Sequence, residues 1–181
     1  MACPSITALP RTCGTEGIYG GLEKLYIIAY KDLAPASGVA GTPIYVLTSG
    51  MVSDIGLVDT KTFVEVGLLK STSGIKETLT KNFQSGTNFF TQESTLILSD
   101  ITTENRAFIN SVRYQPVSIL VKTRTGKWFV TGLNGQLELS AAEGGTGTAE
   151  TDLTGYTLTF QGIDGNMIPQ VEESLIADIV A

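Results

Sequence analysis

The residue types that carry out enzymatic chemistry are scarce in this chain of 181 residues. It contains no histidine, so it lacks the commonest general base and every Ser–His or Cys–His nucleophile pair. The adjacent acids Glu172 and Glu173 resemble a carboxylate pair. On a strand, however, neighbouring side chains point to opposite faces and do not share a substrate. We therefore expect a protein that is not an enzyme and has no catalytic residue.

Motifs for cofactors and metal ions are incomplete as well. The glycine-rich stretch 144–147 lacks the Gly-Lys-Ser/Thr ending of a phosphate-binding loop and fits a hairpin connection. The stretch 164–166 lacks the spaced ligands of a calcium loop, so a plain turn is expected. Cys3 and Cys13 have no second pair to complete a zinc site; they would form one disulfide in an oxidising setting or stay free thiols. We expect no cofactor and no bound metal ion.

Charge is distributed unevenly along the chain. The net charge is −6, from 12 basic and 18 acidic residues, and the pI near 4.6 argues against a nucleic-acid binder with clustered Lys and Arg. No Lys or Arg follows Lys127. Eight acids lie beyond it, and seven of them are candidate lumen or interface residues: Glu138, Glu143, Glu150, Asp152, Asp164, Glu172 and Glu173. A stretch without acids holds the candidate interface bases Arg106, Arg113, Lys122, Arg124 and Lys127. The two blocks would either pair within one chain or form complementary faces on neighbouring copies.

The single tryptophan, Trp128, is the strongest candidate for an anchor. It lies in a hydrophobic stretch beside Val130, which favours a place in the core or in an interface. The alternative is an aromatic sugar-binding platform made of Trp128, Phe129 and Tyr114.

The elements that would position these residues are mainly β-strands. Short runs of β-branched, aliphatic and aromatic residues alternate with Gly, Ser, Asn and Asp clusters. We expect strands at about 24–31, 44–48, 63–69, 77–82, 89–98, 117–124, 127–131, 136–140 and 156–161. Tight turns are expected at 125–126 and, as a two-residue hairpin, at Asn134-Gly135.

One segment favours a helix, at about 103–114. Thr102 or Thr103 can cap its start, Glu104 suits the positive end of the helix dipole, and Pro116 ends it. The last residues, 171–180, fit either a strand or a short helix.

Length and strand pattern predict one mainly β domain, with the single helix covering the end or face of a sheet. The domain would span residues 23–181 after an extended N-terminal arm at 1–22, with projecting loops at 71–86 and 141–152. No stretch reaches the roughly 20 apolar residues of a membrane span, and the first residues lack a secretory signal pattern. We therefore expect no membrane partner and folding in a cytoplasm.

The last third carries a series of motifs in a recognisable order. Phe129–Gly132 reads aromatic-Val-x-Gly, Asn134-Gly135 follows, a small-residue loop contains Thr146-Gly147, and residues 152–162 read Asp-Leu-x-Gly-Tyr-x-Leu-Thr-Phe-x-Gly. The region 119–171 resembles the end of tail tube proteins of long-tailed bacteriophages, particularly those of Bacteroidetes hosts.

This resemblance implies a β-sandwich or β-barrel subunit with one flanking helix. It also implies that the protein is a structural component of the virion tail, assembled in the host cytoplasm. Six copies would form a ring whose inner strands join into one barrel, and stacked rings would form a hollow tube that carries DNA to the host. The partners implied are further copies of the chain and other tail or neck proteins, while DNA passes through the lumen without specific binding. An acidic lumen suits this role because it repels the polyanion that must slide through it.

Two other functions stay open from the sequence. One is a β-sandwich binding module, an adhesin or a carbohydrate-binding domain that uses Trp128. The other is a related phage protein that forms a neck ring, terminates the tail or decorates the capsid.

Overall fold

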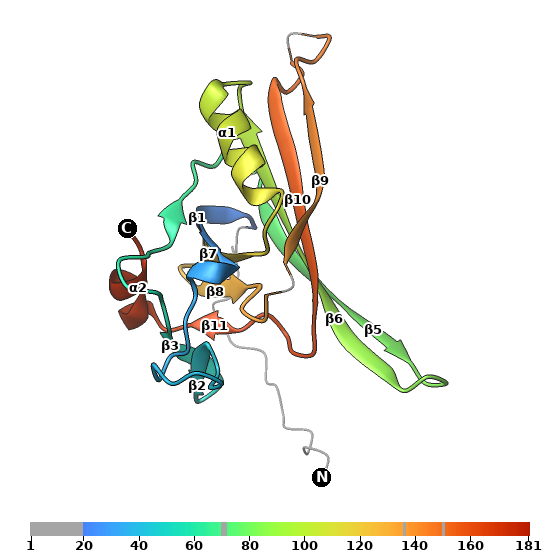
Figure 1. The fold of residues 1–181 in the computed structure, drawn as a ribbon. Helices are drawn as coiled ribbons and strands as arrows, with labels where there is room; N and C mark the ends of the chain where they lie inside the picture. The colour runs from blue at the N-terminus through green and yellow to red at the C-terminus, as the bar shows by residue number, and fades with distance from the viewer. Residues whose placement is uncertain (1–19, 70–71, 136, 150) are drawn as a thin grey trace.

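The structure is a computed structural model that describes residues 20–69, 72–135, 137–149 and 151–181. These residues form two β-sheets and two α-helices (Figure 1). The strands are β1 (Leu22–Ala29), β2 (Tyr45–Thr48), β3 (Met51–Ile55), β4 (Val64–Glu65), β5 (Gly74–Asn82), β6 (Thr87–Ser99), β7 (Val117–Thr123), β8 (Trp128–Thr131), β9 (Glu138–Gly145), β10 (Gly155–Asp164) and β11 (Gln170–Val171). The helices are α1 (Thr103–Val112) and α2 (Glu173–Ile179), and a 3-10 turn, η1 (Tyr30–Asp32), follows β1.

The smaller sheet is built from long antiparallel strands in the order β5-β6-β10-β9. Its longest strand, β6, has 13 residues, which corresponds to about 44 Å. The β5–β6 hairpin extends beyond the body at one end and the β9–β10 hairpin at the other (Figure 1). Every second residue of β6 from Gln92 to Leu98 is buried. This is the period of a strand with one face on a core and the other face turned outward.

The larger sheet has the strand order β2-β3-β11-β8-β7-β1-β4 and is covered on both faces. Leu25 and Ile27 of β1 join a hydrophobic cluster between the two sheets, whereas Tyr26 and Ile28 join a second cluster on the opposite side. The interior strand β7 has five consecutive buried residues, as expected for a strand without a solvent face. The molecule is therefore a layered, mainly β structure with two cores.

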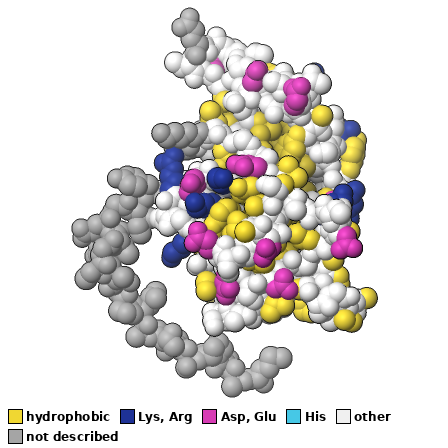
Figure 2. All heavy atoms as spheres, turned by 90° about the vertical axis from the view of Figure 1, so that its left-hand side faces the viewer, with side chains coloured by type: hydrophobic (Ala, Val, Ile, Leu, Met, Phe, Trp, Pro, Cys, Tyr) yellow, Lys and Arg dark blue, Asp and Glu magenta, His cyan; other side chains and the backbone are white. Residues whose placement is uncertain are grey.

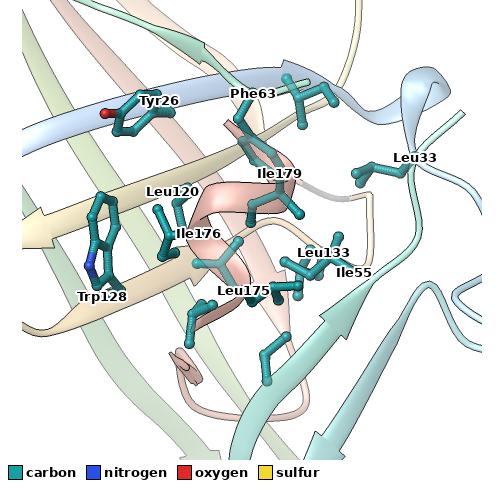
Figure 3. Close-up of a cluster of buried hydrophobic side chains, with 14 residues drawn as sticks. Tyr26, Leu33, Ile55, Phe63, Leu120, Trp128, Leu133, Leu175, Ile176 and Ile179 are labelled. Atoms are coloured by element: carbon teal, nitrogen blue, oxygen red, sulfur yellow. The ribbon is translucent and has the colours of Figure 1, made fainter. Parts of the chain in front are cut away.

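Each helix closes one of these cores. The hydroxyl oxygen of Thr102 accepts a hydrogen bond from the backbone N–H of Asn105 at 3.1 Å, which confirms the expected cap of α1. Val112 of α1 is buried in the cluster between the sheets. Ile176 and Ile179 of α2 point into the second cluster, with Phe63 close by (Figure 3). No helix in the described part of the chain is long and apolar enough to cross a membrane.

Several expected features of the fold differ in the structure. In the described residues neither sheet closes on itself, so the barrel form is wrong and the sandwich form is adopted. Of the two alternatives for segment 171–180, the short helix is the one formed, as α2, so the described residues hold a second helix besides the one expected. Glu172 and Glu173 therefore stand at a helix start rather than on a strand. The expected strand 63–69 pairs only at Val64–Glu65. Strands β3 and β11 were not expected, and β11 has only two residues.

Of the two segments expected as projecting loops, 71–86 is mostly strand and 141–152 is partly strand. Residues 71–86 contain β5, and residues 141–152 begin with the second half of β9. Their polar side chains suggested loops because these strand ends overhang the body, where a sheet has no core to bury apolar residues against. The expected loop character holds only for their tips.

The Asn134-Gly135 turn does not close a hairpin. β8 and β9, which flank it, lie in different sheets, so the turn carries the chain from one layer to the other. In contrast, the turn at 125–126 joins the antiparallel pair β7 and β8 as expected, with the N–H of Gly126 donating to the carbonyl of Thr123 at 2.9 Å.

Two glycines of the motif series occupy positions that only glycine fits. A Cβ at Gly132, whose φ is +76°, would lie 2.5 Å from the carbonyl oxygen of Val117. A Cβ at Gly155, at the start of β10, would lie 2.1 Å from the carbonyl oxygen of Leu98. These glycines therefore set how closely the neighbouring strands approach.

Candidate assembly surface

The most distinctive surface is the side of the smaller sheet that points away from the core, here called the outer face. Its residues alternate with the buried ones of β6 and β10 and stand opposite each other across the four strands. Threonine is its commonest residue, and its large apolar side chains are Phe89, Ile97 and Ile163. The outer face comprises Lys76, Thr78 and Thr80 of β5; Phe89, Thr91, Glu93, Thr95 and Ile97 of β6; Thr157, Thr159, Gln161 and Ile163 of β10; and Glu138, Ala141 and Glu143 of β9.

Acidic groups outnumber basic ones on the outer face. One row across the sheet reads Lys76, Glu93, Gln161 and Glu138, each opposite the next. Glu143 lies further along β9, opposite Thr157. A face of this kind presents hydroxyls and a small excess of negative charge, so it repels rather than captures a polyanion.

Both borders of this sheet are open in the described residues. β5 and β9 each pair on one side only, which leaves strands of nine and eight residues with a free row of backbone N–H and C=O groups. Long free edges are unusual in a monomer because they template pairing with further strands. The geometry can thus support strand addition at both borders.

The candidate acids that the structure describes occupy four separate places. Glu138 and Glu143 lie on the outer face. Asp164 ends β10, where its carboxylate accepts hydrogen bonds from the side chain of Asn134 at 2.6 Å and from the N–H of Asn166 at 2.9 Å. Glu172 and Glu173 stand at the start of α2, which packs on the larger sheet. Asp152 lies in the β9–β10 connection, and Glu150 is outside the described residues.

Asp152 holds its connection together. Its carboxylate accepts hydrogen bonds from the backbone N–H groups of Thr148 at 2.8 Å and Ala149 at 2.9 Å. These two bonds stabilise the charged form and lower the pKa of Asp152 below the ordinary aspartate value. Its place in the structure is that of a residue that orders a loop.

The candidate bases are spread over two regions. Arg106 is exposed on α1, and Arg113 ends that helix with its guanidinium 4.2 Å from the ring centroid of Tyr114. Arg124 and Lys127 lie in the β7–β8 turn. Lys122 forms an ion pair of 3.2 Å with Glu23, an acid from the N-terminal part of the chain. For Lys122 the partner is therefore within the chain, but it is not one of the candidate acids.

The comparisons with known proteins add no relative. No protein-family model, no curated protein and no solved structure matches this chain. What the surface does must therefore be inferred from its geometry and charge.

Trp128 is buried, with 6% of its surface exposed, and anchors the cluster on the α2 side of the larger sheet. Its ring lies beside that of Tyr26 (Figure 3), and the two ring centroids are 6.0 Å apart. The ammonium nitrogen of Lys122 lies 5.8 Å from the Trp128 ring centroid. Its indole N–H has no hydrogen-bond partner among the described residues. The ring is thus packed in a core rather than displayed for stacking on a sugar. Tyr114, by contrast, is exposed beyond the end of α1.

Sequence reasoning missed two residues of the outer face, Lys76 and Glu93. Both precede Lys127 and so lie outside the acidic last third of the chain. The available signal was the alternation of Gln92, Ser94, Leu96 and Leu98 along β6, which marks Glu93 as facing the other way. The distribution of charge along the chain does not show which charged residues share a face of the sheet, because cross-strand neighbours are remote in sequence.

Proposed function

We propose that copies of this chain join side by side through β5 and β9 into a ring lined by the outer face, and that such rings stack into the tail tube of a long-tailed bacteriophage. The observation that carries the proposal is the pair of long free edges on opposite borders of one sheet. Strand directions alternate across the sheet, so β9 of one copy and β5 of the next would meet antiparallel. Each copy would thus continue its neighbour's sheet.

The stagger of the two edges supports closure into a barrel. Thr78, at the centre of β5, lies opposite Thr91 of β6, whereas Ala141 of β9 aligns through Thr159 with Thr95. If Thr78 pairs with Ala141 of the next copy, each copy is displaced along the strand direction by four residues, about 14 Å. This displacement accumulates over the four strand spacings of one copy, about 19 Å. The resulting strand tilt of about 35° is typical of closed barrels. Six copies would give a wall roughly 45 Å across.

The outer face has the character required of a DNA conduit. It would line the lumen with threonine hydroxyls and with Glu93, Glu138 and Glu143, opposed by Lys76. Phosphate neutralisation by basic residues is what holds proteins on DNA, and an excess of acids avoids it. DNA would therefore pass without being trapped.

A charge-swap experiment tests the edge pairing. Within one chain Thr78 and Ala141 are separated by β6 and β10 and by four residues along the strands, about 20 Å in all, so they meet only between copies. The variant T78K/A141K places like charges opposite each other and should abolish rings, while the matched variant T78K/A141E should form them. Negative-stain electron microscopy and sedimentation velocity over a concentration and salt series measure the outcome. Wild-type monomers under all conditions, or rings in T78K/A141K, would contradict the proposal. Rings that never stack would favour a neck or terminator ring.

A further inference from the structure

The tip of the β5–β6 hairpin displays a large aromatic side chain to solvent. Phe83 is 85% exposed, and the ammonium of Lys81 lies 4.9 Å from its ring centroid. Leu79, on the same face of the hairpin as Lys81, is 53% exposed. The turn is ordered by Asn82, whose side-chain oxygen accepts hydrogen bonds from the N–H groups of Gln84 and Ser85 at 2.9 and 3.3 Å. An aromatic ring held out on an ordered turn is typical of an interface anchor.

An apolar groove lies near the opposite end of the same sheet. It runs between residues 64–69 and α1 and has a volume of about 500 Å³. A cavity of about 150 Å³ suffices to bind benzene, so the groove is large enough for a phenyl ring. Figure 2 faces the side that carries β4 and α2 and shows hydrophobic side chains exposed there between acidic ones. The apolar residues that line the groove are Val64, Val66, Leu68, Leu69, Leu98 and Phe108.

Tip and groove cannot meet within one molecule. The groove includes Leu98 and Ser99 at the end of β6, whereas the tip precedes Thr87 at its start. The 13 residues of β6 hold the two about 44 Å apart. A contact between them must therefore join two copies, and a contact between opposite ends of one molecule repeats head to tail.

We propose that the β5–β6 hairpin tip of one copy, with Phe83 as the anchor, docks in the groove between α1 and residues 64–69 of the next copy along the strand direction. Charge complementarity supports this occupant: Glu65 and Glu104 are the charged side chains among the described residues that line the groove, and Lys81 accompanies Phe83. Glu65 also lies near Lys24, whose pKa is raised mainly by a hydrogen bond to Tyr26 and further by Glu65. Glu104 is therefore the freer partner for Lys81. The inference rests on the proposed function in one respect, that this contact stacks the rings.

Stacking variants test the contact in assembled protein. F83S removes the anchor and should weaken ring-to-ring association about 30-fold while leaving ring mass unchanged. The matched control is Y114S, which removes the other strongly exposed aromatic, 78% exposed and likewise stacked with a cation. K81E should also prevent stacking, and E104K in the same chain should restore it. Sedimentation velocity and tube length in electron micrographs measure the effects. Normal stacking of F83S, or no rescue of K81E by E104K, would overturn the inference.

Cysteine trapping tests the same contact without rings. In chains with Cys3 and Cys13 replaced by Ser, S85C marks the tip and G67C marks the groove, where a Cβ meets open space. Mixing the two under mild oxidation should yield the S85C–G67C heterodimer at least tenfold above the S85C–G165C pair, a control glycine in equally open space. Equal yields would overturn the inference. A heterodimer from a protein that forms no rings would instead refute the edge pairing and leave the docking contact standing.

Discussion

Phe160 offers a sharp test of how the two sheets are packed. It is fully buried between them, in the cluster that also holds Leu96 and Leu158, while its neighbour Thr159 belongs to the outer face. The two positions differ by one residue in register, and a slip of one residue would exchange their environments. Comparing the variants F160A and T159V therefore shows which of the two side chains supports the core.

The magnitude follows from burial. Replacing a fully buried Phe by Ala removes its transfer free energy and leaves a cavity, together about 3–5 kcal/mol. For a chain of this length that lowers Tm by roughly 10 °C. T159V keeps a β-branched side chain on the outer face, and the hydrogen bond that Ser140 donates to Thr159 uses the backbone carbonyl. We expect its free energy of unfolding to stay within about 0.5 kcal/mol of the wild-type value.

Denaturation in guanidinium chloride, followed by far-UV circular dichroism, measures both variants. It should be done at a protein concentration that keeps the chain monomeric, because assembly would add stability by mass action. The midpoint should fall strongly for F160A and hardly at all for T159V. A larger loss for T159V would refute the register and with it the assignment of the outer face.

Two further predictions concern Trp128 and Asp152. W128F removes an indole N–H that is buried without a partner among the described residues, and this gain offsets the loss of apolar contact. The free energy of unfolding should therefore change by less than about 1 kcal/mol for W128F, against a loss of about 3–5 kcal/mol for W128A. Thermal denaturation measures both. Because the pKa of Asp152 is lowered in the folded loop, its stabilisation is present above the pKa of the unfolded chain and is lost as pH falls through the folded pKa. Hydrogen exchange at the backbone amides of Thr148 and Ala149 should therefore accelerate in that acidic window relative to neighbouring loop amides. D152A should remove this pH dependence. An unchanged pH profile in D152A would contradict the role of the carboxylate.

Local signals in the sequence predicted those parts of the fold that depend on neighbours along the chain. Thr102, Glu104 and Pro116 specify α1 because capping, dipole and proline effects act within one or two turns. Likewise, the β-branched, aliphatic and aromatic runs at 89–98 and 117–124 predicted the strands β6 and β7.

Other elements depend on partners far away in sequence. β11 has two residues and exists because Gln170 and Val171 fit between β3 and β8, which no local pattern records. The polar strand β5 forms because β6 offers it a complete ladder, and this context overrides its loop-like composition. Asn134-Gly135 has the composition of a hairpin turn, yet the strands on either side of it find different sheets.

By itself the sequence determined a mainly β chain with one capped helix, an acidic last third and no histidine, because composition, period and capping are local properties. Only the tertiary structure decided that Glu93 joins Glu138 and Glu143 on one face, that Asp164 and Asp152 serve turns, and that two edges stay open. The physical reason is that strand pairing joins residues separated by tens of positions. Which side chains share a surface is therefore set by register and sheet order, not by proximity along the chain.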